Sequence, residues 1–399
     1  MILFVDETSS KFLSESEFST VEKIVTINDE LEEWISRSKP IADRPIVMEW
    51  DVFTIPYTSG TTGQPKGVLV PHRSRILTLF GMAVEYGCYS PDDRFLAIAP
   101  MCHGAGMIFS LAPIFFGGYA EIMDQFDPER ILTTFVDENI SGFFGVPTHF
   151  HGILALEKAV LEKASKHQLK TIISNAAALP QQIKEQLVDQ FGDGLLHETY
   201  GSTEGGIISN LRPDDQLRKQ QCVGQAFPCT EIKILNDSGK DCEADEVGEL
   251  FSTSPYLFNG YWNRSEETKE ALHDGWLTVG DMARQDEEGY LYIVDRKKDM
   301  VISGGINVYP REVEEILFKH PNVSDAAVIG IPDEKWGEAI KAYIVTTSSS
   351  EGDAEEIRSF CEQEISKIKV PKIIEFIKEI PRNAGGKVLK TELRKNHDE

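Results

Sequence analysis

The sequence predicts an α/β protein with a large N-terminal domain and a small α+β domain at the C-terminus. Two patterns lead to this prediction. Short apolar runs such as 142–146 alternate with amphipathic segments such as 148–158, as strands alternate with helices in α/β folds. Several of these runs end in Gly, Pro or Ser, which puts loops at the carboxyl ends of strands, where such sheets bind ligands.

The elements are expected in the following order. The run 1–6 looks like a strand from the middle of a domain, and 67–70 is a second strand-like run. Further strands are expected at 95–100, 142–146, 171–174, 231–235, 249–252, 290–294, 326–331 and 342–346, and helices from 104, at 148–158 and 180–191, from 310, and between a Ser-rich connector at 347–353 and about 369.

A change of pattern near residue 298 predicts a domain boundary. Closely spaced short strands and turns fill 231–295, and a cluster of charges follows at 295–299. Pro310 then starts a helix with acidic residues in its first turns, since carboxylates suit the positive end of the helix dipole. We expect domains at 1–297 and 298–399.

Composition predicts a globular cytoplasmic protein. The 399 residues are 41% hydrophobic and 26% charged, enough for more than one domain. The net charge of −25 disfavours nucleic acid or an anionic membrane as a partner. The six cysteines lack metal-ligand spacing and are expected to be reduced thiols. The N-terminus lacks a signal-peptide pattern, and Pro and Gly interrupt the apolar stretch 95–123, so no transmembrane span is expected.

The stretch 57–68, Tyr-Thr-Ser-Gly-Thr-Thr-Gly-Gln-Pro-Lys-Gly-Val, has the composition of a polyphosphate-binding loop. Glycines let backbone N–H groups point at anionic oxygens, hydroxyls add donors, and a lysine supplies positive charge. Pro65 stands where a Walker A loop needs its second glycine, which excludes that motif. A flexible surface loop is the alternative. The candidate phosphate ligands are Thr58, Ser59, Gly60, Thr61, Thr62, Gly63 and Lys66.

The stretch 199–204, Thr-Tyr-Gly-Ser-Thr-Glu, is a second candidate nucleotide motif. Tyr200 can stack on a purine, and Thr203 can donate to an α-phosphate. Glu204 can bind Mg²⁺, a hard cation that prefers carboxylate oxygen. Read alone, the stretch is better explained as an ordinary turn.

Four further segments carry candidate residues, each with a simpler alternative. His103 lies beside glycines and can be purely structural. The small residues of 174–178 let an adenine ring or an acyl chain lie against backbone, or form a tight strand-to-helix turn. Asp281 and Arg296 can bind a ribose or a phosphate, or can be surface charges. Lys387 lies in a Gly-rich segment, where a solvated tail lysine is the alternative.

Taken in order, these motifs resemble those of the adenylate-forming superfamily, and in particular its acyl-CoA synthetase, or fatty-acid CoA ligase, branch. The resemblance also includes the run Gly-Gly-Ile-Asn-Val-Tyr-Pro at 304–310. It implies a large domain of layered αβ sheets and a small, mobile C-terminal lid that carries a catalytic lysine. The family usually has Gly-Gly where this chain has Asn175, Ala176 and Ala177, so the pocket is expected to differ in depth.

The resemblance implies a role for each candidate residue. Lys387 would stabilise charge that develops between the carboxylate and the α-phosphate, and Lys66 would contact the leaving pyrophosphate. The other implied residues are Thr203 at the α-phosphate, Glu204 at Mg²⁺, His103 in the acyl pocket, Asn175, Ala176, Ala177, Tyr200 and Gly201 around the adenine or acyl group, Asp281 and Arg296 at the ribose, Lys298 at the domain hinge, and Gly304 and Gly305 along a pantetheine tunnel.

The implied activity uses ATP, Mg²⁺ and CoA. A carboxylic acid, expected to be a fatty acid, would give acyl-AMP and pyrophosphate, and the acyl group would then pass to CoA. An adenylation domain that loads a carrier protein and a truncated, inactive nucleotide-binding homologue are the alternatives. The chain begins later than family members normally do, which predicts exposed apolar sheet surface unless pairing such as homo-oligomerisation covers it.

Overall fold

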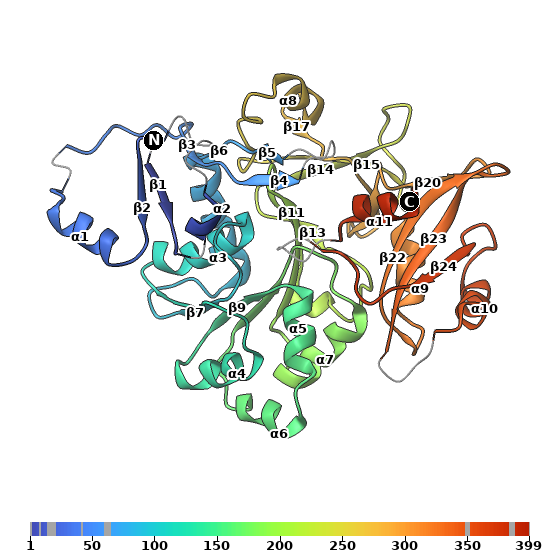
Figure 1. Ribbon diagram of the computed structural model, residues 1–399, viewed down its shortest axis with the longest axis horizontal. Coiled ribbons are helices and arrows are strands. Elements are labelled where there is room, and N and C mark those ends of the chain that lie inside the picture. Colours follow the sequence, from blue (N-terminus) through green and yellow to red (C-terminus); the bar gives the residue numbers. More distant parts are fainter. Residues whose placement is uncertain are drawn as a thin grey trace. The chain divides into compact units, whose positions relative to one another are not determined.

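The computed structural model describes residues 2–7, 9–13, 21–40, 43–59, 65–347, 352–382 and 388–398. The chain divides into two compact units, Met1–Met48 and Glu49–Glu399. In Figure 1 the first unit is dark blue, and the second runs from lighter blue to red.

Unit Met1–Met48 contains a parallel pair of strands and one helix. The side chain of Asn28 caps the helix by accepting a hydrogen bond of 2.9 Å from the Glu30 N–H. The rings of Phe4 and Trp34 pack with their centroids 5.7 Å apart. The strand expected at 1–6 is confirmed. The elements are β1 (Ile2–Val5), a 3₁₀ turn (Ser9–Phe12), β2 (Lys23–Thr26) and α1 (Asp29–Arg37).

Two short antiparallel pairs and a long helix open unit Glu49–Glu399. The run 67–70, expected to be a single strand, is instead divided between two of these strands. The reason is that the Val68 N–H donates to the Pro56 carbonyl and the Leu69 N–H donates to the Gly260 carbonyl, each at 2.9 Å. The elements are β3 (Val52–Thr54) paired with β6 (Val70–Pro71), β4 (Tyr57–Ser59) paired with β5 (Pro65–Gly67), and α2 (His72–Tyr86).

A seven-stranded sheet of order β13-β12-β11-β10-β9-β7-β8 follows. The pairings from β8 to β11 are parallel, and β12 and β13 add antiparallel strands. The strands are β7 (Arg94–Ala97), β8 (Tyr119–Ile122), β9 (Gly142–Gly145), β10 (Thr171–Ser174), β11 (Leu196–Ser202), β12 (Gly206–Leu211) and β13 (Gln225–Ala226). The helices are α3 (Gly104–Phe115), α4 (Pro128–Asp137), α5 (Pro147–Leu154), α6 (Lys158–Leu161) and α7 (Gln181–Phe191).

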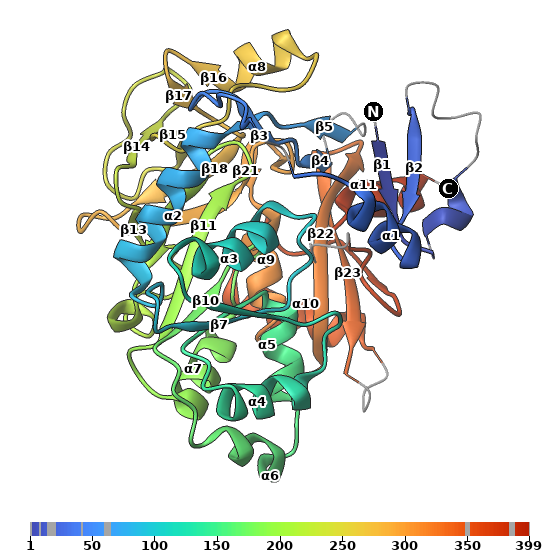
Figure 2. The ribbon, with the colours of Figure 1, turned by 90° about the vertical axis from the view of Figure 1, so that its left-hand side faces the viewer.

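Helices cover both faces of this sheet, because successive strand residues point to opposite sides. In β9, Phe143 packs in one buried cluster with side chains of α4, α5 and α7. The next residue, Phe144, packs in a second cluster with side chains of α2 and α3. Figures 1 and 2 show this layering of helices around the strands. The helix expected at 148–158 is two helices, since α5 ends at Leu154 and the chain turns before α6.

A second sheet forms from the short strands expected within 231–295. Its order is β16-β17-β15-β18-β19, and β14 is an additional neighbour of β15 outside this order. This sheet supplies two of the polar residues described below from its adjacent strands β18 and β19. The elements are β14 (Glu231–Leu235), β15 (Gly248–Thr253), α8 (Ser265–Ala271), β16 (Leu272–His273), β17 (Trp276–Leu277), β18 (Asp281–Gln285) and β19 (Leu291–Arg296).

The C-terminal part forms a third sheet of order β21-β20-β23-β22, with β24 parallel to β23. Strands β22 and β23 are longer than expected, because the Asp333 carboxylate accepts hydrogen bonds from the Lys335 and Trp336 N–H groups and closes a tight hairpin between them. The elements are β20 (Val301–Ser303), β21 (Ile306–Val308), α9 (Pro310–Leu317), β22 (Val323–Asp333), β23 (Gly337–Thr346), α10 (Ala354–Glu364), β24 (Ile373–Phe376) and α11 (Lys390–Asp398).

The helix expected to reach about residue 369 ends at Glu364. Ile365 is extended, and its side chain packs against the buried cluster that α9 and α10 share. The prediction of an α/β fold with a large N-terminal and a small C-terminal domain is confirmed. Within the described ranges, no helix is both long and apolar enough to span a membrane.

Candidate active site

A cavity of about 620 Å³ in unit Glu49–Glu399 gathers residues from most of the sequence motifs. Its walls come from α2, β4, β5, the first turns of α3 and α5, and the ends of β10 and β11. The residues predicted from the sequence that line it are Thr58, Lys66, His103, Asn175, Ala176, Gly201, Thr203, Glu204 and Arg296.

The pairing of β4 with β5 positions the start and the end of the phosphate-loop candidate. Thr58 pairs with Lys66, so both residues reach the cavity from adjacent strands. The Lys66 ammonium lies 5.1 Å from the centre of the Tyr261 ring, a cation–π contact. The backbone of Ser59 belongs to β4. The loop candidates Gly60, Thr61, Thr62 and Gly63 lie outside the described residues.

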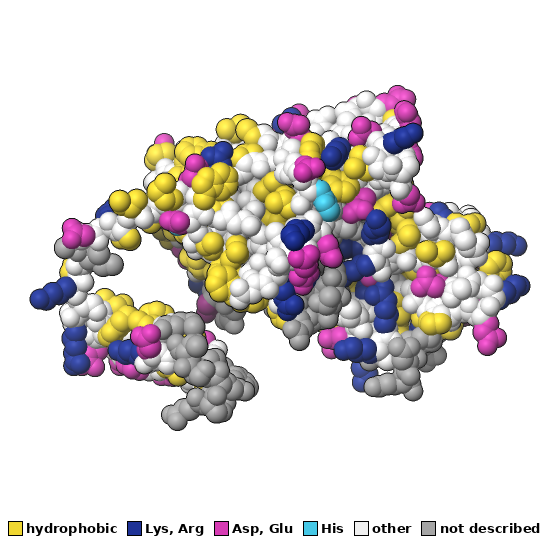
Figure 3. All heavy atoms as spheres, turned by 90° about the horizontal axis from the view of Figure 1, so that it is seen from above, with side chains coloured by type: hydrophobic (Ala, Val, Ile, Leu, Met, Phe, Trp, Pro, Cys, Tyr) yellow, Lys and Arg dark blue, Asp and Glu magenta, His cyan; other side chains and the backbone are white. Residues whose placement is uncertain are grey.

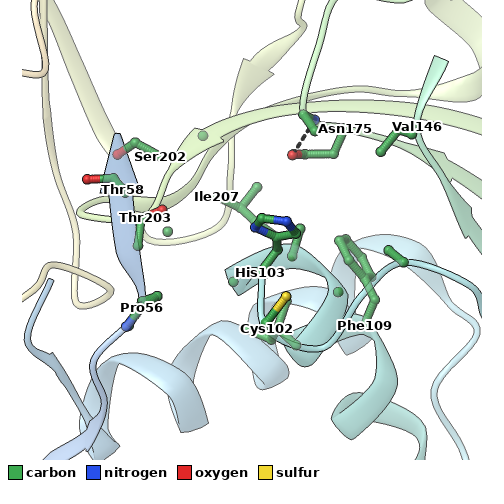
Figure 4. Close-up of a pocket in the computed structure, with 18 of the residues that line it drawn as sticks. Pro56, Thr58, Cys102, His103, Phe109, Val146, Asn175, Ser202, Thr203 and Ile207 are labelled. Atoms are coloured by element: carbon green, nitrogen blue, oxygen red, sulfur yellow. Dashed lines mark hydrogen bonds between the residues drawn. The ribbon is translucent and has the colours of Figure 1, made fainter. Parts of the chain in front are cut away.

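The second motif turns from β11 into β12 beside the cavity. A Cβ atom on Gly201 would stand 2.1 Å from the Gly206 carbonyl oxygen, so the turn needs glycine there. Thr58, Ser202 and Thr203 all line the cavity and lie close to one another in Figure 4. This turn therefore brings hydroxyl groups from two separate motifs together.

Glu204 is buried and accepts a hydrogen bond of 2.8 Å from the Tyr261 hydroxyl. Burial raises the pKa of Tyr261, and the neighbouring Glu204 charge raises it further, so this hydroxyl stays a donor. Within the described residues, no group of three His, Cys, Asp or Glu side chains could hold a metal ion. A cation at Glu204 would therefore complete its coordination with water and with oxygens of a bound molecule, such as a phosphate.

Tyr200, Asp281 and Arg296 form one polar network across two sheets. The Tyr200 hydroxyl donates to the buried Asp281 carboxylate, and the Arg296 Nε atom lies 2.7 Å from the same carboxylate. Burial and the Asp281 charge raise the pKa of Tyr200 well above its ordinary value. Burial opposes the charge of Arg296, but Asp281 and the other acidic groups around it together outweigh burial and raise the pKa of that guanidinium. Of the three, Arg296 lines the cavity.

The small-residue segment after β10 adopts an unusual backbone. The Asn175 amide donates to the Thr199 carbonyl at 3.0 Å and to the Thr199 hydroxyl at 2.7 Å. Ala176 has a φ of +76°, a left-handed conformation that costs an L-residue about 1 kcal/mol. A glycine would adopt it freely, which explains in physical terms why glycine suits this position. Ala177 follows but is not among the described residues that line the cavity.

His103 lines the cavity beside its apolar part (Figure 4). It precedes α3 as its N-cap residue, and its Nε2 atom is buried without a hydrogen-bond partner in the described structure. Figure 4 shows its ring between Ile207 and Cys102, with Phe109 and Val146 beyond. The apolar lining residues are Ile108, Phe109, Phe144, Val146 and Ile207.

Besides Tyr200, Asp281 and Ala177, three further predicted residues, Lys298, Gly304 and Gly305, lie away from the described cavity lining. Burial lowers the pKa of the Lys298 ammonium, which follows β19. Gly304 and Gly305 turn between β20 and β21 with φ values of +59° and +79°. Lys387 lies outside the described residues.

Among the lining side chains that sequence reasoning missed are the polar groups of Arg75, Tyr261 and Arg382. Arg75 lies on α2, and the sequence alone predicts only that a basic residue of this helix belongs to its solvent-exposed face. Tyr261 follows no recognisable motif. Arg382 pairs with Asp325 at 2.9 Å. Figure 3 shows Lys and Arg side chains close to Asp and Glu on one face of the molecule, despite the net charge of −25.

Two family models match the chain. The model of the AMP-binding enzyme matches residues 2–262, and that of the AMP-binding enzyme C-terminal domain matches residues 312–387. These matches confirm the resemblance drawn from the motifs.

Curated relatives are CoA ligases of different acids. A long-chain-fatty-acid–CoA ligase of Bacillus subtilis is 35% identical over 354 residues, which cover 88% of this chain and 63% of that protein. A feruloyl-CoA synthase of an Amycolatopsis species is 35% identical over 360 residues, or 88% of this chain and 71% of that protein. A 2-succinylbenzoate–CoA ligase of Bacillus cytotoxicus is 34% identical over 86% of this chain and 70% of its own length. The chain thus spans 63% to 71% of the length of these relatives.

Solved structures agree in fold. ATP-bound MatB from Rhodopseudomonas palustris superposes with a TM-score of 0.89 at 27% identity, covering 100% of this chain and 79% of that one. The o-succinylbenzoate CoA synthetase of Bacillus subtilis, in complex with ATP and magnesium ion, gives a TM-score of 0.84 at 26% identity over 98% of this chain and 78% of that one. Together with the family models, these relatives show that the chain belongs to the AMP-binding enzyme family.

Proposed function

We propose that this chain activates a carboxylic acid with ATP, forming acyl-AMP and pyrophosphate, and then transfers the acyl group to the thiol of CoA. The observation that supports it best is one cavity with two chemical characters. Hydroxyl and charged groups of Thr58, Lys66, Thr203, Glu204 and Arg296 line one part, and apolar side chains line another. The first part suits a nucleoside triphosphate, and the second suits the hydrocarbon part of an organic acid.

In the proposed reaction, the acid carboxylate attacks the α-phosphorus, and the bond to pyrophosphate breaks. Thr58 and Lys66, with the loop 59–63, hold the leaving phosphates, and Thr203 donates to the α-phosphate. Glu204 supplies a carboxylate oxygen to Mg²⁺, which neutralises phosphate charge when bound. Asp281 and Arg296 bind the ribose, and Tyr200 with the segment 175–177 borders the adenine.

Other roles rest on the family resemblance. Lys387 stabilises the charge that develops at the α-phosphate, Lys298 is the hinge between domains 1–297 and 298–399, and Gly304 and Gly305 border the path of the CoA arm. His103 borders the acyl group. We also assign the chain to the cytoplasm, because all six cysteines are free thiols.

The apolar lining supports a hydrophobic acid, a fatty acid among them. The relatives are named for long-chain fatty, feruloyl and 2-succinylbenzoyl acids, so the acid is the least constrained part of the proposal. A pyrophosphate-release assay across acids of graded length and aromaticity, with ATP and Mg²⁺, tests the first step. Acyl-CoA formation on adding CoA tests the second. Absence of both products with every acid would refute the proposal.

A variant of Lys387 tests the proposed role of this lysine. Lys387→Ala should lose the first step far more than the conversion of supplied acyl-AMP to acyl-CoA, because its charge acts only in acyl-AMP formation. Equal losses in the two half-reactions would contradict the role.

A further inference from the structure

Arg75 is a cation in the cavity without a counter-charge. It lies in the first turn of α2 and lines the cavity, yet its Nε and Nη2 atoms are buried with no hydrogen-bond partner in the described structure. Burial lowers the pKa of Arg75 to about 10, so the group remains charged at neutral pH. A half-buried guanidinium with two buried, unused donors is unfavourable unless an anion joins it.

The protein's own acids do not fill this role within the described residues. Of the other basic side chains at the cavity, Arg296 pairs with Asp281 and Arg382 pairs with Asp325, whereas Lys66 lies over the Tyr261 ring. The carboxylate that lines the same cavity, Glu204, instead accepts from Tyr261. The complementary charge for Arg75 must therefore come from a bound molecule.

The position of Arg75 indicates which part of that molecule it meets. Its Nη2 atom lies 3.7 Å from the point where a Cβ of Gly104 would stand, at the start of α3. His103, the N-cap of the same helix, has a buried Nε2 atom that also lacks a partner. Both groups thus lie beside the helix that brings Ile108 and Phe109 to the apolar wall, rather than on the strands that carry Thr58 and Lys66.

We propose that Arg75 binds a second carboxylate on the acid substrate, which makes dicarboxylic acids the preferred substrate class. This inference rests on the proposed function and assigns its substrate. The guanidinium fork matches a carboxylate in two parallel hydrogen bonds, and the N–H groups at the start of α3 favour the same negative charge. One carboxylate of the substrate would react with ATP, and the other would remain ionised beside Arg75.

The experiment compares acids matched in length with the full chain. Adipate and hexanoate, glutarate and pentanoate, and suberate and octanoate are assayed by pyrophosphate release for the wild type, Arg75→Met and Arg75→Lys. We expect kcat/KM in the wild type to favour the diacid at least tenfold in one or more pairs. Arg75→Met should abolish that preference while it changes the monoacid less than threefold, and Arg75→Lys should restore part of it.

Arg73→Met is the matched control, because Arg73 lies on the same helix and pairs with Glu49. It should keep the wild-type preference. A wild type that favours the monoacid in every pair, or a preference unchanged in Arg75→Met, overturns the inference and leaves the proposed function standing. A rise in KM for ATP without a change of preference would assign Arg75 to phosphate and also overturn it.

If no acid is activated, the proposed function is refuted, but the inference about Arg75 can still be tested. Isothermal titration calorimetry then measures the binding of the acids, and thermal melting measures the stability of the variants. Adipate should then bind to the wild type more tightly than hexanoate, and Arg75→Met should remove the difference; equal binding overturns the inference. The melting temperature of Arg75→Met should stay level or rise, since an unpaired buried charge is removed. A fall of several degrees with equal losses for both acids would show a structural role and overturn the inference.

Discussion

At the scale of single residues, the site depends on buried charges that each have one or two partners. Glu204 is held by the Tyr261 hydroxyl, and Asp281 is held by Tyr200 and Arg296. Because each partner is buried or half-buried, removing it leaves a charge that water reaches poorly.

Replacing Tyr261 with phenylalanine should loosen the Glu204 carboxylate. A hydrogen bond to a charged group contributes about 1.5–3 kcal/mol. We expect the Mg²⁺ concentration for half-maximal pyrophosphate release to rise severalfold in Tyr261→Phe. Tyr256→Phe is the control, since the Tyr256 hydroxyl donates to the Pro228 carbonyl at 2.6 Å. An unchanged Mg²⁺ dependence in Tyr261→Phe would contradict the role of Glu204.

Replacing Arg296 with alanine should leave Asp281 as an uncompensated buried charge. We expect the free energy of unfolding, from urea denaturation, to fall by about 3 kcal/mol. Adding Asp281→Asn removes the stranded charge, so the double variant should regain most of that loss. Losses that simply add in the double variant would show that the pair does not interact.

Replacing Gly201 with alanine tests the tight turn after β11. Its new Cβ would stand 2.1 Å from a backbone oxygen, so the backbone must move. We expect a loss of about 3 kcal/mol in the free energy of unfolding. Gly87→Ala offers the comparison, because Gly87 has a φ of +63° but open space around it, and its cost should be only about 1 kcal/mol. Equal costs would refute the steric argument.

At the scale of elements, residues at the ends of strands form part of the site. Another residue at a strand end, Asp93, makes the stability of the fold depend on pH. Asp93 precedes β7 and is buried; the Lys170 ammonium, before β10, lies 2.7 Å from its carboxylate, and the Ser90 hydroxyl donates to it at 2.7 Å. Burial alone would raise the pKa of Asp93, but these partners lower it below 3.8.

This lowered pKa predicts a stability that depends on pH. A carboxylate whose pKa is lower in the folded state stabilises the fold above its unfolded pKa and loses that contribution as the pH falls through the folded value. Asp93→Asn should therefore be less stable than the wild type at pH 7, by about 1–3 kcal/mol, and the difference should shrink between pH 5 and pH 3. Urea denaturation at pH 7, 5, 4 and 3 measures it, and a constant difference would contradict the assignment.

The elements also show what the sequence could predict. The strand expected at 142–146 and the helix expected from 310 were recognisable because apolar periodicity and proline act locally. The length of the β22–β23 hairpin could not be recognised from the sequence, because cross-strand hydrogen bonds extend the hairpin beyond its apolar residues. The contact of Tyr200 with Asp281 joins residues 81 positions apart, and Arg75 belongs to no motif, so only the fold could bring these groups to the cavity.

At the scale of the whole molecule, the net charge of −25 acts on any anionic substrate. The Debye length is about 30 Å at 0.01 M salt and about 8 Å at 0.15 M, so added salt screens the distant acidic charge before it screens contacts in the cavity. We expect the KM for ATP, at constant Mg²⁺, to fall as NaCl rises from 10 to 150 mM. A steady rise over that range would show that the local basic groups dominate instead.

Strand β9, which lies inside the seven-stranded sheet, has a consequence for folding. Its neighbouring residues Phe143 and Phe144 belong to the buried clusters on opposite faces of the seven-stranded sheet. A shift of one residue in the pairing of β9 would exchange these two side chains between the faces and disrupt both clusters together. Strands β7 and β10 also send neighbouring residues into both clusters. The two helical layers are therefore coupled through the sheet, and local unfolding of either layer should expose the other within the same cooperative transition.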